Sequence, residues 1–262
     1  MKTFYTIIAM MLIASASAQP GSWKMIGKAG DWANTTHAVQ TGNTLYSVEK
    51  SGRFYVTDAP SGVWKQVGEA NYGNTAFMFA GNGMVYTIET SGSLYAINPA
   101  DGSWKQVGKT GAWIGTICGT ILNGKLYTVE KSGALYVTNL STGAWLMAGK
   151  AEFGNTWRIW SANQKLYTIE TNGSLYEVDP NSGAWKPVGE AGSWKNTING
   201  VVMNNILYSI EQNGTLYATD LETGKWIQVG SAEFANTAFM TAGTGKLYTI
   251  ETSGSLYEVN VQ

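Results

Sequence analysis

The stretch LYTIETNGSLYEVDPNSGAWKPVG, residues 166–189, contains the unit from which nearly the whole chain is built. Its segments LYTIE and SLYEVD alternate apolar and polar residues with a period of two and are rich in Tyr, Ile, Leu and Val, which predicts two strands. The Thr-Asn-Gly link between them, residues 171–173, supplies the Asn and Gly that suit the positive-φ position of a tight hairpin. Residues 180–183 predict a second turn and residues 184–189 a third strand, so the unit is an antiparallel meander.

This unit recurs along the chain with a nearly constant period. The Glu that ends the first strand and the Trp that begins the third strand each return at intervals of 40 or 41 positions. A period this regular, in this length range, is typical of a solenoid or a propeller. The glutamates are Glu49, Glu89, Glu130, Glu170, Glu211 and Glu251, and the tryptophans are Trp23, Trp64, Trp104, Trp145, Trp185 and Trp226.

A fourth apolar segment, such as residues 76–81 or 117–122, lies between the third strand of one unit and the first strand of the next. Each unit therefore contains four antiparallel strands, A to D, and repeated four-stranded units are the blades of a β-propeller. The chain has a D strand at residues 22–27 without a blade of its own, and it ends on a C strand at residues 255–262 without a D strand. We predict an all-β, six-bladed propeller whose last blade is closed by the N-terminal strand.

The first 18 residues have a basic Lys2, a short apolar run and small residues ending at Ala18, which predicts a secretory signal peptide cleaved near Ala18. Residues 19–262 are expected to form one propeller domain, exported to the extracellular space or the periplasm and monomeric, without membrane insertion. Without Lys2 the chain has 16 basic and 18 acidic residues, a net charge of −2. This near-neutral surface argues against nucleic acid as a partner.

A longer period runs through the D–A connectors. Trp32, Trp113 and Trp194 recur at intervals of 81 positions, and so do Tyr72, Phe153 and Phe234 in the alternate connectors. The ring is therefore expected to consist of three units, each made of two paired repeats. Sites made by these loops should come in sets of three or six.

The D–A connectors and the B–C hairpins of a propeller emerge on the same rim, where this chain repeats an aromatic residue, an amide and a carboxylate. An aromatic face can stack on the apolar face of a neutral sugar, while amides and carboxylates exchange hydrogen bonds with its hydroxyls. The candidate sugar-binding residues are Trp32, Asn34, Tyr72, Asn74, Trp113, Phe153, Asn155, Trp194, Asn196, Phe234, Asn236 and the six glutamates Glu49, Glu89, Glu130, Glu170, Glu211 and Glu251.

Structural roles remain open for each of these groups. The glutamates can accept N–H groups of their own hairpins or pair with Lys50 or Lys131, and the Asn-Thr steps can simply turn the chain into strand A. The connector aromatics can act as plugs over the blade core. We expect the twelve B- and C-strand tyrosines to be mostly core, and the D-strand tryptophans to be wedges between outer blade edges rather than stacking surfaces.

The repeated pattern G-x-[L/V]-Y-[T/S]-[I/V]-E-x-[S/N]-G-x-[L/F]-Y, followed by W-x-x-[V/I/A]-G, resembles the tectonin repeat family and the related tachylectin-2 type of lectin propeller. The resemblance covers residues 22–262 and implies a sugar-binding propeller with several equivalent sites. Tyr stands where tectonin repeats commonly place Trp in strand B, and Glu replaces a small polar residue at the end of that strand.

The first functional hypothesis is thus a calcium-independent, multivalent carbohydrate-binding protein for glycans or glycoconjugates, with N-acetylhexosamines among the ligands. The alternative is a protein-interaction scaffold at the cell surface or in the secretome. An enzyme is not expected, because His37 is the only histidine and Arg53 and Arg158 are the only arginines, and six equivalent glutamates do not provide a differentiated acid and nucleophile. We predict no catalytic residue, no metal and no cofactor.

Overall fold

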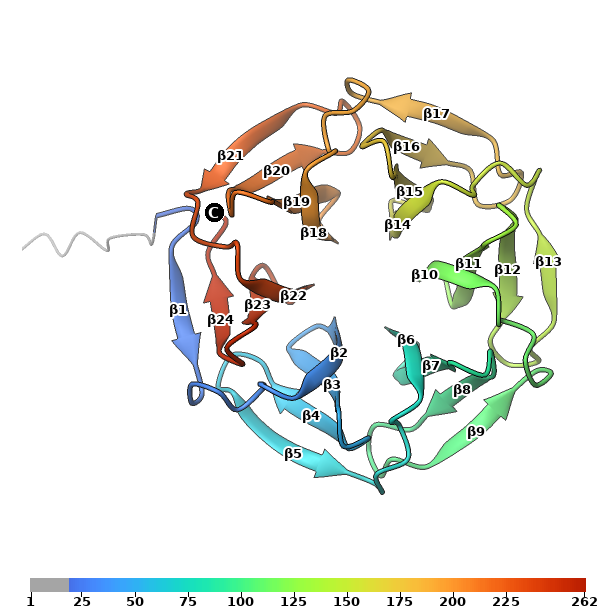
Figure 1. Cartoon of the computed structure of the whole chain (residues 1–262), viewed down its shortest axis with the longest axis horizontal. Helices are drawn as coiled ribbons and strands as arrows, with labels where there is room; N and C mark the ends of the chain where they lie inside the picture. Colours follow the sequence, from blue (N-terminus) through green and yellow to red (C-terminus); the bar gives the residue numbers. More distant parts are fainter. Residues whose placement is uncertain (1–18) are drawn as a thin grey trace, which may run out of the picture.

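The structure is a computed structural model that describes residues 19–262, and it shows six four-stranded antiparallel sheets arranged around a ring (Figure 1). The proposed signal peptide lies outside the described residues. Within each sheet, strand A lies next to the ring centre and strand D lies at the periphery, where it runs around the circumference. The predicted six-bladed, all-β architecture is confirmed.

The blades are numbered in chain order, so that the N-terminal strand belongs to the last of them. Blade 1 contains β2 (Thr35–Thr41), β3 (Thr44–Glu49), β4 (Phe54–Asp58) and β5 (Val63–Val67). Blade 2 contains β6 (Thr75–Gly81), β7 (Met84–Glu89), β8 (Leu94–Ile97) and β9 (Trp104–Val107). Blade 3 contains β10 (Thr116–Leu122), β11 (Lys125–Glu130), β12 (Leu135–Asn139) and β13 (Trp145–Met147).

The second half of the ring follows the same order. Blade 4 contains β14 (Thr156–Ala162), β15 (Lys165–Glu170), β16 (Leu175–Val178) and β17 (Trp185–Val188). Blade 5 contains β18 (Thr197–Met203), β19 (Ile206–Glu211), β20 (Leu216–Asp220) and β21 (Trp226–Gly230). Blade 6 contains β22 (Thr237–Ala242), β23 (Leu247–Glu251), β24 (Leu256–Val259) and β1 (Trp23–Ile26).

Blade 6 closes the ring by combining the two ends of the described chain. Strand β1 pairs antiparallel with β24 from Trp23 opposite Val259 to Ile26 opposite Leu256. An ion pair of 3.3 Å between Lys24 Nζ and Glu258 Oε1 joins the same two strands. The N-terminal segment therefore supplies the missing D strand, as the phase of the repeat predicts, and both ends lie side by side in Figure 1.

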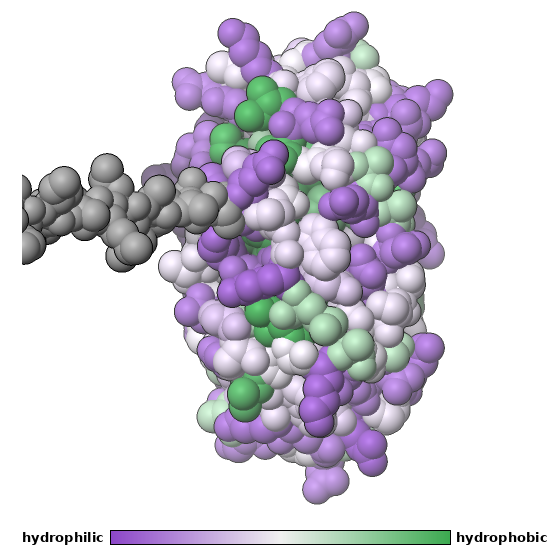
Figure 2. All heavy atoms as spheres, turned by 90° about the vertical axis from the view of Figure 1, so that its left-hand side faces the viewer, coloured by the Kyte–Doolittle hydropathy of each residue, from purple (hydrophilic) through white to green (hydrophobic). Residues whose placement is uncertain are grey.

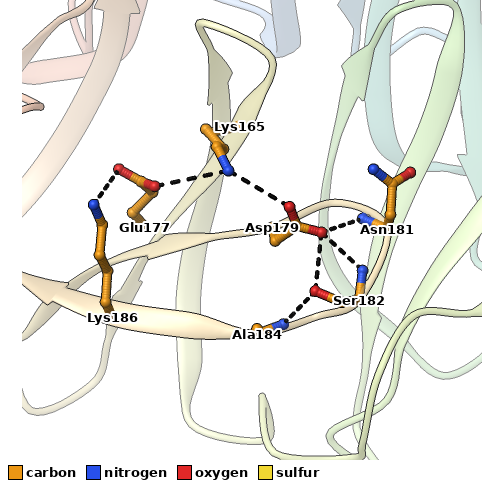
Figure 3. A network of polar contacts seen from close by, with 7 residues as sticks. All are labelled: Lys165, Glu177, Asp179, Asn181, Ser182, Ala184 and Lys186. Carbon is orange, nitrogen blue, oxygen red and sulfur yellow. Dashed lines mark hydrogen bonds and ion pairs between the residues drawn. The ribbon is translucent and has the colours of Figure 1, made fainter.

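The C–D turns are held by a side chain at the end of strand C. In blade 4, Asp179 Oδ1 accepts hydrogen bonds from the backbone N–H groups of Asn181 and Ser182 and from the Ser182 hydroxyl, at 2.9 to 3.0 Å (Figure 3). These hydrogen bonds lower the pKa of Asp179 to about 2, and the bond from the Ser182 backbone N–H has the largest effect. Lys165 joins this turn to strand C by ion pairs of 3.5 Å to Asp179 and 3.9 Å to Glu177.

Six hydrophobic clusters hold neighbouring blades together. The cluster between blades 4 and 5, for example, combines Ile169, Leu175 and Val188 with Leu207 and Leu221. Strands B contribute most, because both of their faces are covered by adjacent blades. The prediction for the tyrosines is only half right: five of the six B-strand tyrosines are buried, whereas all six C-strand tyrosines are half-buried.

Neighbouring blades also touch through pairs of glycines, one at the end of a D strand and one in the C–D turn of the following blade. A Cβ built on Gly143 would lie 2.1 Å from Cα of Gly108, and a Cβ on Gly224 would lie 2.3 Å from Cα of Gly189. No side chain fits at these positions. The regular spacing of the repeat therefore includes a backbone seam between adjacent blades.

The six D-strand tryptophans are not wedges, which corrects the sequence-based expectation. Each is 45 to 54% exposed, and each contacts the strand-C tyrosine of its own blade edge-on, with ring centroids 4.7 to 5.3 Å apart. The reason is topological. Strand D is the outermost strand, so that its side chains meet strand C on one side and solvent on the other.

The outer wall is mixed in character. Figure 2 shows the ring edge-on, with a mostly hydrophilic surface interrupted by separate hydrophobic patches. Met25, Leu146 and Ile227 of the D strands are among the exposed apolar residues. In the part of the chain that the structure describes, no helix is long and apolar enough to cross a membrane.

Candidate functional site

Each D–A connector is clamped between two B–C hairpins. The backbone N–H of Trp194 donates to the carbonyl of Gly173 in the hairpin of blade 4, and the N–H of Gln212 in the hairpin of blade 5 donates to the carbonyl of Asn196. The same two bonds recur around the ring, with Gly115 in place of Asn in blade 3. The Asn-Thr steps therefore have a structural role through their backbones. The side chains of Asn34, Asn74, Asn155, Asn196 and Asn236 are all exposed.

The connector aromatics are buried. Trp32, Tyr72, Trp113, Phe153, Trp194 and Phe234 have exposed fractions of 3 to 5%. The indole N–H groups of Trp113 and Trp194 each donate to a strand-C threonine, Thr138 and Thr219, at 3.3 Å. These rings plug the blade core, so that none of them presents a free face to solvent.

The six candidate glutamates are half-buried at the ends of strands B, and they do not all have the same partners. Glu211 accepts a hydrogen bond of 2.8 Å from the Thr197 hydroxyl, and Glu130 accepts one of 2.9 Å from Thr116. In contrast, the equivalent hydroxyls of Thr35, Thr156 and Thr237 are buried without a hydrogen-bond partner among the described residues.

Some of the predicted residues meet in a pocket on blade 5, here called the blade-5 pocket, with a volume of about 390 Å³. It lies between the connector, the β19–β20 hairpin and one face of the blade. Register places Tyr217 opposite Ser209 in strand B, and Trp226 opposite Thr219, so these four residues share that face. The lining residues are Ser193, Trp194, Asn196, Ser209, Glu211, Gln212, Asn213, Tyr217, Thr219 and Trp226.

A second pocket, the blade-3 pocket, occupies the equivalent place two repeats earlier and has a volume of about 270 Å³. Trp113, Glu130, Tyr136 and Trp145 correspond to Trp194, Glu211, Tyr217 and Trp226. The remaining lining residues are Ala112, Ile114, Gly115, Thr128, Lys131 and Ser132.

In blade 3, Gly115 stands where the other five connectors have Asn. A Cβ at this position would lie 2.2 Å from Glu130 Oε2, so a larger residue would displace the carboxylate. The hydroxyl of Thr128, which lines this pocket, is buried without a hydrogen-bond partner in residues 19–262. The blade-3 pocket thus contains a polar atom that protein groups leave unsatisfied.

The environment of both carboxylates favours their neutral form. Burial raises the pKa of Glu211 above its ordinary value, and the hydrogen bond from Thr197 partly opposes this rise. Burial likewise raises the pKa of Glu130, against the opposing effects of Thr116 and Lys131. Each pocket therefore holds a partly desolvated carboxylate that gains from a hydrogen-bond donor supplied by a ligand.

The structure thus brings together Trp194, Asn196 and Glu211 in one pocket, and Trp113 and Glu130 in the other. The other candidates, Trp32, Asn34, Glu49, Tyr72, Asn74, Glu89, Phe153, Asn155, Glu170, Phe234, Asn236 and Glu251, occupy equivalent rim positions outside these two pockets. Sequence reasoning missed the exposed Trp145 and Trp226, and also their neighbours Tyr136 and Tyr217. The available signal was the position of the two tryptophans on strand D, the outermost strand of each blade.

The central channel, with a volume of about 590 Å³, is lined by strands A. His37 Nε2 lies 3.1 Å from the Ala76 carbonyl, and burial lowers the pKa of this histidine. Cys118 is buried, which raises the pKa of its thiol to about 12. Arg158 lines the same channel, 5.2 Å from the ring of Trp157.

Residues 19–262 contain no group of three His, Cys, Asp or Glu side chains arranged to hold a metal ion. The pocket chemistry is accordingly that of aromatic surface, carboxylate, amide and hydroxyl groups.

No protein-family model matches the chain, and no curated protein matches its sequence. Solved structures share the fold. A Bacteroides thetaiotaomicron protein of unknown function has a TM-score of 0.65 at 14% identity, over 93% of this chain and 73% of that one. YCF48 from Cyanidioschyzon merolae has a TM-score of 0.56 at 13% identity, over 86% of this chain and 82% of that one.

BamB from Moraxella catarrhalis has a TM-score of 0.50 at 17% identity, over 85% of this chain and 68% of that one. YCF48 has also been solved bound to a D1 peptide. At these identities the likeness establishes the propeller fold alone. The resemblance to the tectonin family stays a prediction.

Proposed function

We propose that this chain is a secreted, non-enzymatic carbohydrate-binding protein whose sugar sites are the blade-5 and blade-3 pockets. The observation that supports the proposal is the recurrence, two repeats apart, of one exposed Trp, one tyrosine and one partly desolvated Glu around a pocket. Export depends on residues 1–18 acting as a signal peptide.

The pocket chemistry suits a neutral sugar. The exposed indole of Trp226 offers an apolar face to the C–H groups of a pyranose, and Glu211 accepts hydrogen bonds from its hydroxyl or acetamido N–H groups. Asn196 and Asn213 add amide groups that both donate and accept. N-acetylhexosamines fit this combination because they present an apolar face, donors and a carbonyl acceptor.

Two shallow sites on one molecule give a physical reason for the repeat. A millimolar dissociation constant corresponds to about 4 kcal/mol per site. Two sites engaging one glycan-dense surface raise the apparent affinity by about 10²- to 10⁴-fold when the geometry lets both bind. The repeat would then act through avidity rather than through one tight site.

Calorimetry with N-acetylglucosamine, preceded by a glycan array, tests the proposal. We expect two sites per chain, and we expect the W145F/W226F double variant to bind several-fold more weakly, because a hydrogen bond from the indole N–H contributes about 0.5–1.5 kcal/mol. The matched control is W185F. In the parent, the indole N–H of Trp185 already donates to Glu152 at 3.1 Å, so sugar binding should not change in this variant. A folded protein that binds no glycan on a broad array would refute the proposal.

A second candidate is a peptide-binding scaffold. Leu146 and Met147 on the outer strand β13 are 74% and 52% exposed beside Trp145, and YCF48, which shares the fold, has been solved with a bound peptide. The variant L146S separates the two functions. The parent should capture a protein partner that N-acetylglucosamine does not release, and L146S should abolish this capture. The same variant should leave the number of sugar sites unchanged.

A further inference from the structure

We infer that blade 1 contains a third copy of the pocket, which Asp31 keeps closed, and that the residue at this connector position, here called the gate residue, determines how many sites are open. The inference rests on the proposed function for the identity of the ligand. The closing contact itself is a property of the free protein and has its own readout.

Blade 1 repeats the blade-5 pocket almost residue for residue. Seven of the lining residues recur in blade 1 with the same side chain, each 162 positions earlier in the sequence. They are Trp32, Asn34, Ser47, Glu49, Tyr55, Thr57 and Trp64, which correspond to Trp194, Asn196, Ser209, Glu211, Tyr217, Thr219 and Trp226. The three lining positions that differ are Asp31, Lys50 and Ser51, where blade 5 has Ser193, Gln212 and Asn213, and of these only Asp31 lies next to the connector aromatic.

Asp31 occupies the hydrogen-bonding position of a ligand. Its Oδ2 accepts a bond of 3.2 Å from the indole Nε1–H of Trp64. In blade 5 the shorter Ser193 lines the pocket, and the Nε1–H of Trp226 has no partner in the described structure. The small Ala112 likewise leaves the indole N–H of Trp145 unpaired among residues 19–262 in blade 3.

Two other blades repeat the closing contact with a longer acid. Trp185 Nε1–H donates to Glu152 at 3.1 Å in blade 4, and Trp23 Nε1–H donates to Glu233 at 2.9 Å in blade 6. An acidic gate residue therefore engages the outer tryptophan in every blade that has one. The blade-5 and blade-3 pockets belong to blades that lack it, and in blade 2 the gate residue is the larger Asn71.

A second contact changes together with the gate residue. In blades 3 and 5 the first threonine of strand A donates to the pocket glutamate, at 2.9 and 2.8 Å. In blades 1, 4 and 6, where the gate residue is an acid, the corresponding hydroxyls of Thr35, Thr156 and Thr237 are buried and have no hydrogen-bond partner in the described range. A blade with an open pocket thus combines a small gate residue with a glutamate that accepts a hydrogen bond from the strand-A threonine.

The gate residue also specifies the ligand. Since a carboxylate oxygen of Asp31 satisfies the indole N–H of Trp64, the ligand of an open pocket has to bring its own acceptor to Trp226. Glu211 in the same pocket disfavours a negatively charged acceptor. A neutral oxygen, such as a hydroxyl or an acetamido carbonyl, meets both requirements.

The reciprocal variants D31S and S193D test the gate by calorimetry with N-acetylglucosamine. We expect the stoichiometry to rise from two to three in D31S and to fall from two to one in S193D, with S193A as the control that keeps two sites. An unchanged stoichiometry in both reciprocal variants would overturn the inference.

A ligand-free measurement separates failure of the gate from failure of the sugar proposal. In the ¹H–¹⁵N spectrum of the whole protein, the Trp64 indole N–H signal should have the position of a hydrogen-bonded N–H and should exchange slowly with solvent. In D31S this signal should move and its exchange with solvent should become at least several-fold faster. A Trp64 signal that is identical in D31S would refute the gate, whereas the expected change together with no sugar binding would refute only the proposed function.

Discussion

At the scale of single residues, the function depends on how a few side chains of one repeat depart from the others. Glu211 and Glu130 are the same residue type as the other four strand-end glutamates, yet among the described residues only these two accept a bond from a strand-A threonine. Ser193 and Ala112 are small where three other blades have an acid. Neither difference changes the fold, and both decide whether a pocket has free hydrogen-bonding groups.

The raised pKa of Glu211 predicts a pH dependence. Burial raises the folded-state pKa above the ordinary 4.5, so this carboxyl takes up a proton at a higher pH than a solvated one, and the protonated oxygen then donates a hydrogen bond instead of accepting one. Sugar affinity should therefore fall as the pH decreases through a value above 4.5, measured by calorimetry between pH 7 and pH 4. Affinity that is constant over this range would contradict the assigned role.

The same shift has the opposite sign for stability. A carboxyl whose folded pKa is raised contributes stability below its unfolded pKa, and that contribution is lost as the pH rises through the folded pKa. Replacing Glu211 by Gln removes the cost of the buried charge. The variant should melt at a higher temperature than the parent at pH 7 and bind N-acetylglucosamine more weakly, a combination that a purely structural glutamate would not give.

At the scale of single elements, the strands and turns follow from the sequence because each has a local cause. The period of two in LYTIE predicts β15, and the Asn-Gly steps predict the A–B turns, where Asn82 and Asn123 have φ values of 53° and 49°. The exposure of Trp226 does not follow in the same way. A tryptophan in an alternating segment has the same pattern in an inner and an outer strand, and only the position of strand D at the periphery distinguishes them.

The glycine seam between blades gives a prediction at this scale. Gly143 has φ +72°, and an added Cβ would lie 2.1 Å from Cα of Gly108, whereas Gly83 has φ +71° with nothing within 4 Å. G83A should cost about 1 kcal/mol of unfolding free energy from backbone strain alone. G143A should cost about 1–3 kcal/mol more because two blades have to separate. Equal losses in urea unfolding would show that the seam is not tightly packed.

At the scale of the whole molecule, the ring is closed by β1, and its phase could be predicted from the repeat. The candidate site could be predicted only in part. The rim and the glutamates were found because they repeat, but the pockets exist where Ser193 and Ala112 replace an acid, and the consequence of that replacement depends on the distance to an indole of strand D. The repeat alone predicts six equivalent positions, whereas the structure describes a rim pocket in blade 5 and another in blade 3.

Closure predicts the effect of removing β1. Deletion of residues 22–27 removes the pairing with β24, the Lys24–Glu258 ion pair and the buried Ile26. We expect the melting temperature to fall by about 10 °C or more, since 1 kcal/mol corresponds to about 2–4 °C for a chain of this size. An unchanged melting curve would mean that β1 contributes little to the stability of the ring.

The most direct test of the central claim is a crystal structure of the protein soaked with N-acetylglucosamine. We predict one sugar in the blade-5 pocket and one in the blade-3 pocket, with the pyranose against Trp226 and Trp145 and a hydroxyl or amide group donating to Glu211 and Glu130. Blade 1 should be empty, with Asp31 still bonded to Trp64. Sugar bound only in the central channel, or pockets that stay empty at saturating sugar, would contradict the account.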